Sequence, residues 1–235
     1  MTKTLKILRK QLEKIKDRGF IKTNRVHDNG VGKTLEDLLG IKENNFRLPD
    51  VGNIELKAKR IESGSMLTIA TKSPEPRGVN KILFEKYKYK DKEGHYSLHS
   101  PVCGSRENNQ SFRVVFEKDR LVLKNKYNIQ AFWPASIFNE VLIAKSNNIL
   151  LVLAETKGKR KTKSEKFHYV EAHLLSRLNM NKFKSAIEND KLKIDVRIGS
   201  YGTGKKKGKY HDHGTGFRIN KRDFLHLFDN FKKII

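Results

Sequence analysis

The 235-residue chain is long enough to bury the core of one sizeable domain or two small ones, and apolar segments such as residues 149–154 recur along it, which excludes a disordered chain. Its 50 Lys and Arg against 26 Asp and Glu leave a formal net charge of +24, which indicates a polyanionic partner but would also suit a basic or ribosome-associated protein. The single Cys103 excludes an internal disulfide, and no apolar run approaches the ~18 residues of a membrane-spanning helix, so we expect a cytoplasmic protein without membrane attachment.

The spacing of apolar residues predicts the elements of the N-terminal part of the chain. These are, in chain order, an amphipathic helix at 4–17 ended by Gly19, a polar loop at 22–32, a short helix from a Thr34–Asp37 capping box to Gly40, and consecutive strands at 54–61 and 66–71 joined by the turn 62–65.

The remainder reads as alternating helices, strands and polar loops. We predict a helix at 78–90, a polar loop at 92–110, a hairpin of 112–116 with 121–123, a helix at 135–145, strands at 149–156 and 167–175, a helix at 180–188, a strand at 192–198, a glycine- and lysine-rich loop at 199–214, a strand at 215–219 and a closing amphipathic helix at 221–233. The result is a mixed α/β chain with no obvious domain boundary.

The segment 48–57, Leu-Pro-Asp-Val-Gly-Asn-Ile-Glu-Leu-Lys, carries a candidate catalytic site. Residues two apart on a strand share a face, so Glu55 and Lys57 are expected side by side, with apolar neighbours on the opposite face. Asp50 precedes the turn 51–53, which can bring its carboxylate beside Glu55. Two carboxylates form a hard oxygen site suited to Mg²⁺. The neighbouring lysine can orient or deprotonate a water and stabilise charge on a phosphate.

Each of these residues also has a simpler explanation. Glu55 and Lys57 could form an ordinary exposed ion pair on a solvated strand. Glu36, on the short helix, could supply a further carboxylate to the metal, or it could be a solvated acid that favours the helix N-terminus.

Residues 197–218 are the candidate DNA-reading segment. Lys205, Lys206, Lys207 and Lys209 lie on a glycine-flexible loop and suit phosphate contacts, which give affinity without sequence information. The residues that could reach base edges in the major groove are Arg197, Tyr201, His211, His213 and Arg218. The alternative is a solvated basic loop.

Two other patterns are set aside. Residues 30–34, Gly-Val-Gly-Lys-Thr, look like the end of a phosphate-binding loop, but the first glycine of that motif would fall at His27 and no buried strand precedes it. His211 and His213 alternate on a loop with no further ligand at a recognised spacing, so they indicate a polar contact surface rather than a metal site.

Four stretches resemble the MvaI/BcnI family of type II restriction endonucleases, whose catalytic domain is similar to that of the mismatch-repair nickase MutH. They are GKTLEDLL at 32–39, LPD with IELK within 48–57, LTIATKSPEPRGVN at 67–80, and DVRIGSYGTGKKKGKYHDHGTGFRIN at 195–220. Their order and spacing extend over essentially the whole chain, and the likeness is closer to the MvaI side of the family.

This resemblance implies a PD-(D/E)xK, MutH-like α+β fold, with a mixed sheet flanked by helices and a DNA-recognition lobe. Residues 1–235 would form one endonuclease chain, which could divide into a catalytic lobe centred on 30–80 and a recognition lobe centred on 195–220. It implies that Asp50, Glu55 and Lys57 are catalytic, that Asp50 and Glu55 bind Mg²⁺, and that Glu36 supports the metal site.

The resemblance also implies base recognition by Arg197, Tyr201, His211, His213 and Arg218. Family members act as monomers on double-stranded DNA at CC-N-GG sites, cutting one strand at a time. Gly216 stands where the BcnI-like pattern has a histidine, which favours CCWGG over CCSGG. A cognate DNA methyltransferase is implied as a functional companion, not as a stable complex.

Two alternative functions remain open at this point. A MutH-like repair nickase would share the chemistry but would need partner proteins for activation. A basic, non-catalytic nucleic-acid-binding protein would share the charge but would not cleave DNA.

Overall fold

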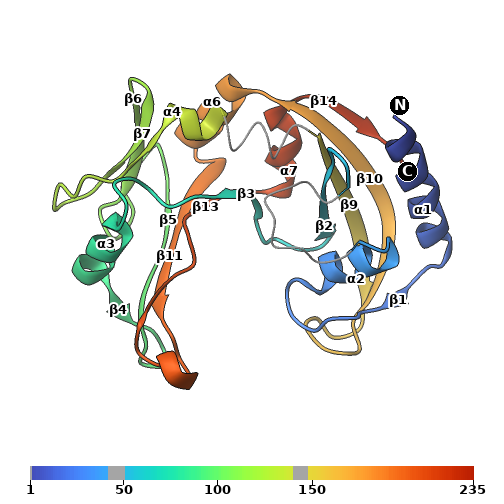
Figure 1. The fold of residues 1–235 in the computed structure, drawn as a ribbon, viewed down its shortest axis with the longest axis horizontal. Helices are drawn as coiled ribbons and strands as arrows, with labels where there is room; N and C mark the ends of the chain where they lie inside the picture. The colour runs from blue at the N-terminus through green and yellow to red at the C-terminus, as the bar shows by residue number, and fades with distance from the viewer. Residues whose placement is uncertain (1, 42–50, 140–147) are drawn as a thin grey trace. The chain divides into compact units, whose positions relative to one another are not determined.

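The computed structural model describes residues 2–41, 51–139 and 148–235, and the chain divides into two compact units (Figure 1). Unit 1 comprises Met1–Ser65, Lys145–Leu178 and Phe228–Ile235, whereas unit 2 comprises Met66–Ala144 and Asn179–Leu227. Each unit is assembled from segments that are distant in the sequence, which is why no boundary is visible in the composition. That the units act as a catalytic and a recognition lobe stays a prediction.

Unit 1 is built on a mixed five-stranded sheet in the order β1-β10-β9-β2, with β14 paired to the free part of β10. Strands β2 and β9 run parallel, whereas β10 pairs antiparallel with β1, β9 and β14. The elements of unit 1 are α1 (Lys3–Asp17), β1 (Ile21–Lys22), α2 (Gly30–Leu38), β2 (Glu55–Arg60), β9 (Asn148–Lys157), β10 (Lys166–Leu178) and β14 (Phe228–Lys233).

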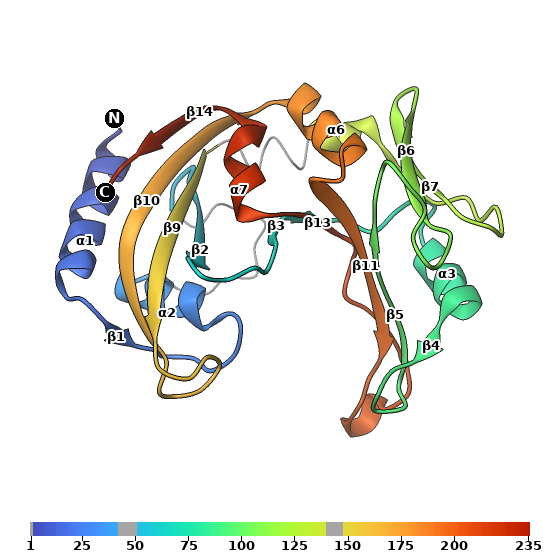
Figure 2. The ribbon, with the colours of Figure 1, turned by 180° about the vertical axis from the view of Figure 1, so that it is seen from behind.

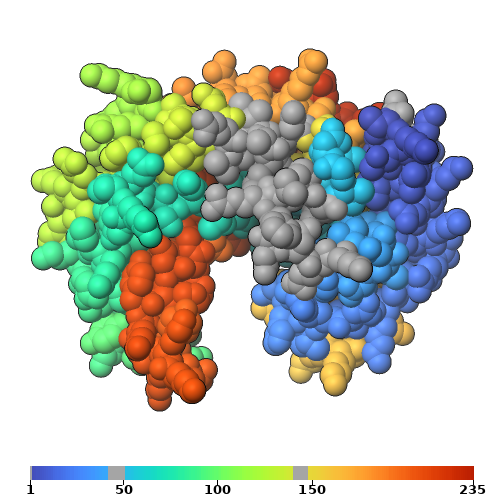
Figure 3. Space-filling view, viewed as in Figure 1, coloured from blue at the N-terminus to red at the C-terminus, as the bar shows by residue number. Residues whose placement is uncertain are grey.

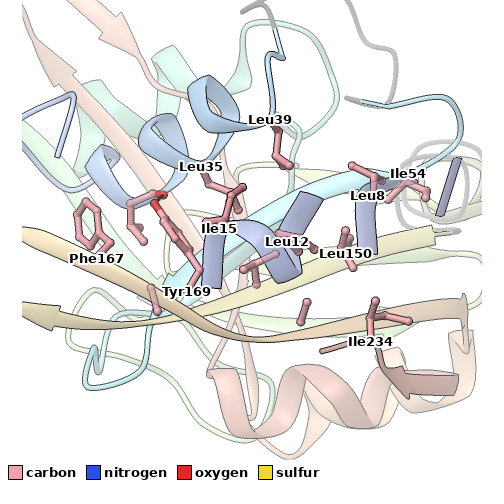
Figure 4. Close-up of a cluster of buried hydrophobic side chains, with 14 of the residues drawn as sticks. Leu8, Leu12, Ile15, Leu35, Leu39, Ile54, Leu150, Phe167, Tyr169 and Ile234 are labelled. Atoms are coloured by element: carbon pink, nitrogen blue, oxygen red, sulfur yellow. Dashed lines mark hydrogen bonds between the residues drawn. The ribbon is translucent and has the colours of Figure 1, made fainter. Parts of the chain in front are cut away.

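Helices α1 and α2 share one hydrophobic core with the sheet of unit 1 (Figure 4). The predicted helix at 4–17 is confirmed as α1, whose buried residues Leu5, Leu8, Leu12 and Ile15 follow the helical period. In the core they meet Leu35 of α2 together with residues of β9 and β10. Burial of this stripe therefore fixes α1 against the sheet.

α2 begins at Gly30, so the predicted start at a Thr34 capping box is wrong. Thr34 is fully buried within the helix, and its Oγ1 accepts a hydrogen bond at 3.0 Å from the backbone N–H of Asn24. The hydroxyl therefore satisfies the preceding loop instead of capping its own helix. The Tyr169 hydroxyl of β10 donates a 2.8 Å hydrogen bond to the Val31 carbonyl and so ties α2 to the sheet.

A buried ion pair joins the end of β2 to the loop between β9 and β10. The guanidinium of Arg60 donates from Nε to Glu165 Oε1 at 2.7 Å and from Nη2 to Glu165 Oε2 at 3.0 Å, and both side chains are almost fully buried. Arg60 Nη1 also donates to the Asp28 carbonyl at 2.9 Å. One cation therefore links β2, the hairpin loop and the segment that leads into α2.

Unit 2 contains a six-stranded sheet in the order β3-β13-β11-β5-β4, with β12 paired to β11, and a three-stranded sheet β6-β7-β8. Figure 2 shows β11 and β5 running side by side. The elements are β3 (Leu67–Thr71), α3 (Val79–Tyr87), β4 (Tyr89–Lys90), β5 (Tyr96–Val102), β6 (Arg113–Glu117), β7 (Arg120–Lys124), β8 (Phe132–Pro134), α4 (Ala135–Ile137), α6 (Met180–Glu188), β11 (Leu192–Ser200), η2 (Gly204–Lys206), β12 (Tyr210–Asp212), β13 (Gly216–Ile219), α7 (Lys221–Phe224) and η3 (Leu225–Leu227).

Several predicted elements of unit 2 are confirmed. The helices expected at 78–90 and 180–188 are α3 and α6, and the strand expected at 192–198 is β11. The hairpin expected around residue 118 is β6 with β7. Of the helix expected at 135–145, α4 covers 135–137, and residues 140–147 lie outside the described part of the chain.

The predicted polar loop at 92–110 is wrong, because β5 lies within it and pairs with β11 and β4. Leu98, Ser100 and Val102 are buried at every second position of β5. Because the middle residue of this buried row, Ser100, is polar, the two-residue period of hydrophobic residues expected for a strand is interrupted in the sequence.

The strands on either side of residues 62–65 do not pair with each other. β2 belongs to the sheet of unit 1 and β3 to that of unit 2. Residues 62–65, predicted as a turn between consecutive strands, therefore connect the two units. The predicted closing helix at 221–233 is also wrong, because only Lys221–Phe224 and Leu225–Leu227 are helical and Phe228–Lys233 is β14. Pairing with β10 satisfies the backbone of that segment and outweighs its helical spacing.

No helix in the described ranges is long and apolar enough to cross a membrane. The observed architecture is the mixed α+β arrangement that the sequence predicted.

We expect Glu165→Ala to lower the free energy of unfolding by about 3 to 5 kcal/mol, because it leaves the Arg60 guanidinium buried without its counter-ion. Denaturant-induced unfolding measures the change. The matched control is Glu13→Ala, which breaks an exposed pair with Arg9 and should cost at most about 1 kcal/mol. Equal losses in the two variants would contradict a structural role for the buried pair.

Candidate functional site

Glu55 and Lys57 lie together on β2, as residues two apart on a strand should. Lys57 Nζ is 3.4 Å from Glu55 Oε1, and the two side chains are 18% and 23% exposed. The alternate residues of this segment, Ile54 and Leu56, pack in the core of unit 1. Parallel pairing with β9 holds the backbone straight here, with Glu55 opposite Ile149. The acid and the amine are therefore half-buried but open to a ligand.

A tight turn precedes this pair. Val51 N–H donates to the Ile54 carbonyl at 3.1 Å, and Ile54 N–H donates to the Val51 carbonyl at 2.9 Å. Gly52 occupies the turn with φ +60°, a conformation that favours glycine. The chain thus reverses direction immediately before Glu55. Asp50, the other predicted catalytic carboxylate, lies outside the described residues.

Glu36 lies on α2, the helix that packs against β2. Lys33 Nζ lies 3.5 Å from Glu36 Oε2 and 3.4 Å from Asp37 Oδ1, so one ammonium group is shared between two carboxylates. Leu35 holds this part of the helix in the same core as Ile54. The structure therefore brings the helix of Glu36 to the strand of Glu55.

The donor chemistry of β2 fits a hard divalent cation, because Glu55 offers carboxylate oxygens and the strand offers no thiolate or imidazole. Among the described residues, no group of three or more His, Cys, Asp and Glu side chains is close enough to hold a metal ion.

The aromatic residues of the predicted DNA-reading segment do come together in unit 2. Tyr201 and His211 stack with ring centroids 4.3 Å apart and an interplanar angle of 8°. His211 and His213 follow at 4.0 Å and 50°. The pairing of β12 with β11 positions the His211 ring. His211 lies opposite Gly199, and the missing side chain at position 199 leaves room for the His211 ring to stack on that of Tyr201.

Asp212 organises this cluster, a role that the sequence reading missed. Its carboxylate accepts hydrogen bonds from Gly214 N–H at 2.7 Å, from Asn80 Nδ2 at 2.8 Å and from Ser73 Oγ at 3.3 Å. Ser73 and Asn80 are far from Asp212 in the sequence, so only its place between two histidines could have drawn attention to it. The effect is to fix the backbone on either side of His211 and His213.

Arg197 and Arg218 flank Gly216. A Cβ at position 216 would meet Arg197 Nη2 and Arg218 Cγ, each at 3.4 Å. Arg197 Nε donates to the Gly214 carbonyl at 3.3 Å, whereas Arg218 Nη1 forms a 2.6 Å ion pair with Asp195. Arg218 Nε is buried without a hydrogen-bond partner in the part of the chain that the structure describes. Arg197 Nη2 also lies 3.5 Å from Thr71 Oγ1 and from the His213 carbonyl, so hydrogen bonds or ion pairs position both guanidinium groups before any ligand binds.

The four predicted phosphate-binding lysines lie in and directly after η2, and all are exposed. In Figure 3 this orange-red segment projects at the lower end of unit 2. Lys206 Nζ lies 5.6 Å from the centre of the Tyr201 ring, which links this basic segment to the aromatic cluster. The residues concerned are Lys205, Lys206, Lys207 and Lys209.

The pKa of His213 lies below its ordinary value. Burial is the largest cause, followed by repulsion from the charged forms of His211 and His99 and from Arg197, while Asp212 acts in the opposite direction. The imidazole therefore stays neutral at pH 7, with one nitrogen that donates and one that accepts.

The family model for the MvaI/BcnI restriction endonuclease family matches residues 9–228. The chain belongs to this family. Among solved structures it is similar to "Restriction endonuclease MvaI-cognate DNA substrate complex", with 35% identity, a TM-score of 0.86 and 100% of both chains covered. It is also similar to "Restriction endonuclease MvaI in the absence of DNA", with 32% identity, a TM-score of 0.59 and coverage of 100% of this chain and 99% of the other. No curated protein sequence matches it.

Family membership makes this MvaI/BcnI-family protein a type II restriction endonuclease, that is, a site-specific deoxyribonuclease. The resemblance and the class of enzyme predicted from the sequence are confirmed.

We expect His213 to titrate with a midpoint below about 6.5 in an NMR titration of the free protein. Because the folded state binds this proton less readily than the unfolded chain, the His213 contribution to the free energy of unfolding is lost as the pH falls below about 6.5. His211→Asn removes one repelling group and should raise the midpoint. A midpoint above 6.5 in the wild-type protein would contradict this account.

Proposed function

We propose that this enzyme hydrolyses both strands of duplex DNA at CC-N-GG sites with Mg²⁺, and that Asp50, Glu55 and Lys57 form its catalytic centre. The observation that carries the proposal is the Glu55–Lys57 pair, 3.4 Å apart on β2, in a chain that belongs to a restriction endonuclease family. Glu55, together with Asp50, would hold the cation, and Glu36 on α2 would support it.

The reversal of the chain between Val51 and Ile54 supports the place of Asp50 in this set, because a pairing of Asp50 with Glu55 requires such a turn. When bound, Mg²⁺ would supply positive charge against the negative charge that develops on the scissile phosphate. Carboxylate oxygens are the ligands that this cation prefers.

Lys57 would orient the attacking water and stabilise charge on the phosphate oxygens. Its contact with Glu55 holds the ammonium group in a half-buried position, where an electrostatic interaction is stronger than in bulk water. The core packing of Ile54 and Leu56 restricts motion of the strand beneath it. The Lys57 amine and the Glu55 carboxylate are thus preorganised before a phosphate binds.

Duplex DNA is the proposed substrate, and the solved MvaI complex with cognate DNA, to which this chain is similar, supports it. The exposed lysines of residues 205–209 would contact phosphates, and their effect should weaken with salt. Tyr201, His211 and His213, whose rings lie against one another, would contact base edges together with Arg197 and Arg218. By the same family resemblance, we propose a monomer that acts alongside a cognate methyltransferase.

For the central base pair we propose A or T. Gly216 lies between the Arg197 and Arg218 side chains, and a Cβ at this position would already be in contact with both at 3.4 Å. Because Gly216 stands where the BcnI-like pattern has a histidine, this chain lacks that contact to the central base pair, which favours the CCWGG form of the site over the CCSGG form.

Lys57→Ala should reduce the cleavage rate of unmethylated plasmid DNA at least about 100- to 1,000-fold, the loss typical of removing one group that stabilises transition-state charge. Binding of the same DNA should change little, because Lys57 contributes one of many positive charges. Lys6→Ala on the exposed face of α1 is the control and should cut normally. Undiminished cutting by Lys57→Ala with intact binding would refute the catalytic assignment.

The same plasmid assay separates the other possible functions. Unaided double-strand cutting at discrete sites by the purified wild-type chain argues against a repair nickase that needs partners. Salt-sensitive binding without any metal-dependent cleavage would instead leave a non-catalytic DNA-binding protein.

Gly216→His should lower the preference for CCWGG, measured by run-off sequencing of fragments from DNA of known sequence. The larger side chain displaces Arg197 and Arg218, and a lost bidentate base contact costs about 1 to 3 kcal/mol. Gly216→Ala adds only a Cβ at ordinary contact distance and should keep the preference. If both variants cut like the wild type, Gly216 does not set the central base.

A further inference from the structure

The face of the sheet that carries Arg197 continues from β11 onto the neighbouring strand β5. Arg197 lies opposite His99, and Asp195 lies opposite Pro101. Residues directly opposite each other in an antiparallel pair project to the same face. His99 and Pro101 on this row are exposed, whereas Leu98 and Ser100, which project to the opposite face, are buried. The proposed base-reading face is therefore wider than the segment 197–218.

His99 lies near the aromatic cluster on this face. Its ring centroid is 6.5 Å from that of His213, with an interplanar angle of 74°. Within the described residues, neither ring nitrogen of His99 makes a hydrogen bond, so both remain available to an external partner.

A pocket of about 320 Å³ opens beside this imidazole, entirely within unit 2. The residues that line it are His99, Ser100, Pro101, Asn108, Asn109 and Gln110. Strand β5 provides one wall, and the loop that leads into β6 provides the other.

Asn108 builds that loop wall. Its Nδ2 donates to Ser100 Oγ at 2.8 Å and to the Pro101 carbonyl at 2.9 Å, which anchors the loop to β5. Its Oδ1 accepts from the backbone N–H groups of Gln110 at 3.0 Å and Phe112 at 3.1 Å. All the hydrogen-bonding capacity of this side chain serves the loop, so the segment 109–110 is held in place before any ligand binds.

The groups left over at the pocket are directional hydrogen-bonding groups. In the described part of the chain, the side-chain amides of Asn109 and Gln110 make no hydrogen bond, and no lysine or arginine lines the pocket. Phosphate contacts in this protein can come from its many cations, whereas amides and an imidazole pair with donors and acceptors on base edges. The chemistry of the pocket therefore suits a base edge better than a phosphate.

We propose that His99, with the side-chain amides of Asn109 and Gln110, forms a further base-reading site that discriminates a base pair next to those contacted by Arg197 and His213. This inference rests on the proposed DNA-cleaving function and adds a second reading element, on β5 and its following loop. It assigns a specificity role to residues 99–110, outside the glycine- and lysine-rich segment.

The test compares His99→Ala and Gln110→Ala with matched controls elsewhere in unit 2, His226→Ala and Gln130→Ala, both of which replace exposed side chains. Each protein selects from a duplex library randomised within and beside the CC-N-GG site, once by binding with Ca²⁺ in place of Mg²⁺ and once by cleavage with Mg²⁺. The two pocket variants should lose about 5-fold or more discrimination at one base-pair position. The two controls should select like the wild type, and thermal unfolding should show that all four variants are folded.

Two results would overturn the inference. One is selection by both pocket variants that is identical to that of the wild type. The other is a uniform loss of affinity across all sequences with a smaller salt dependence, which would mark His99 as a phosphate contact. Selective binding by the wild type without cleavage would refute only the catalytic proposal. Wild-type binding without any sequence preference would refute base reading by both elements, while cleavage could still be measured.

Discussion

The parallel pairing of β2 with β9 is the constraint on which the candidate active site depends. It fixes which side chains of residues 54–60 enter the core and which reach solvent, because neighbouring residues on a strand project to opposite faces. Ile54 and Leu56 anchor the strand, and Glu55 and Lys57 are thereby held side by side. The buried Arg60 ion pair at the end of β2 ties the same strand to the segment before α2. The strand that packs in the core of unit 1 is therefore also the strand that carries the proposed catalytic side chains.

Unit 2 separates two kinds of group that would contact DNA in the proposed function. Its exposed lysines carry charge, which gives affinity for any phosphate backbone. Its cluster of Tyr201, His211 and His213 carries directional hydrogen-bonding groups, and burial together with neighbouring charges lowers the pKa of His213. Asp212 fixes the backbone between the two histidines through partners from other parts of the unit, Ser73 and Asn80. A rigid platform of this kind suits recognition, because little conformational freedom has to be lost when a base edge is met.

Elements governed by local interactions were predictable. The apolar spacing of α1, the hairpin of β6 with β7, and the strands β9 and β11 follow from periodicity within a few residues. Elements governed by a distant partner were not. β14 forms because β10 offers an unpaired edge, and β5 forms between β11 and β4 although Ser100 interrupts its apolar row. Because β5 was not predicted, His99, which lies on that strand, was not recognised as a candidate site residue.

The sequence by itself determined the family, the class of enzyme, the mixed α+β fold and the neighbourhood of Glu55 and Lys57, because motif order, charge and strand period are all properties of the chain read in line. Only the tertiary structure decided that β2 and β3 belong to different units, that Asp212 and Asn108 are organising residues, and that Arg197 and Arg218 share the space beside Gly216. These facts depend on hydrogen bonds and contacts between residues far apart in the chain. No local pattern encodes such pairs, since each partner alone is an ordinary polar side chain.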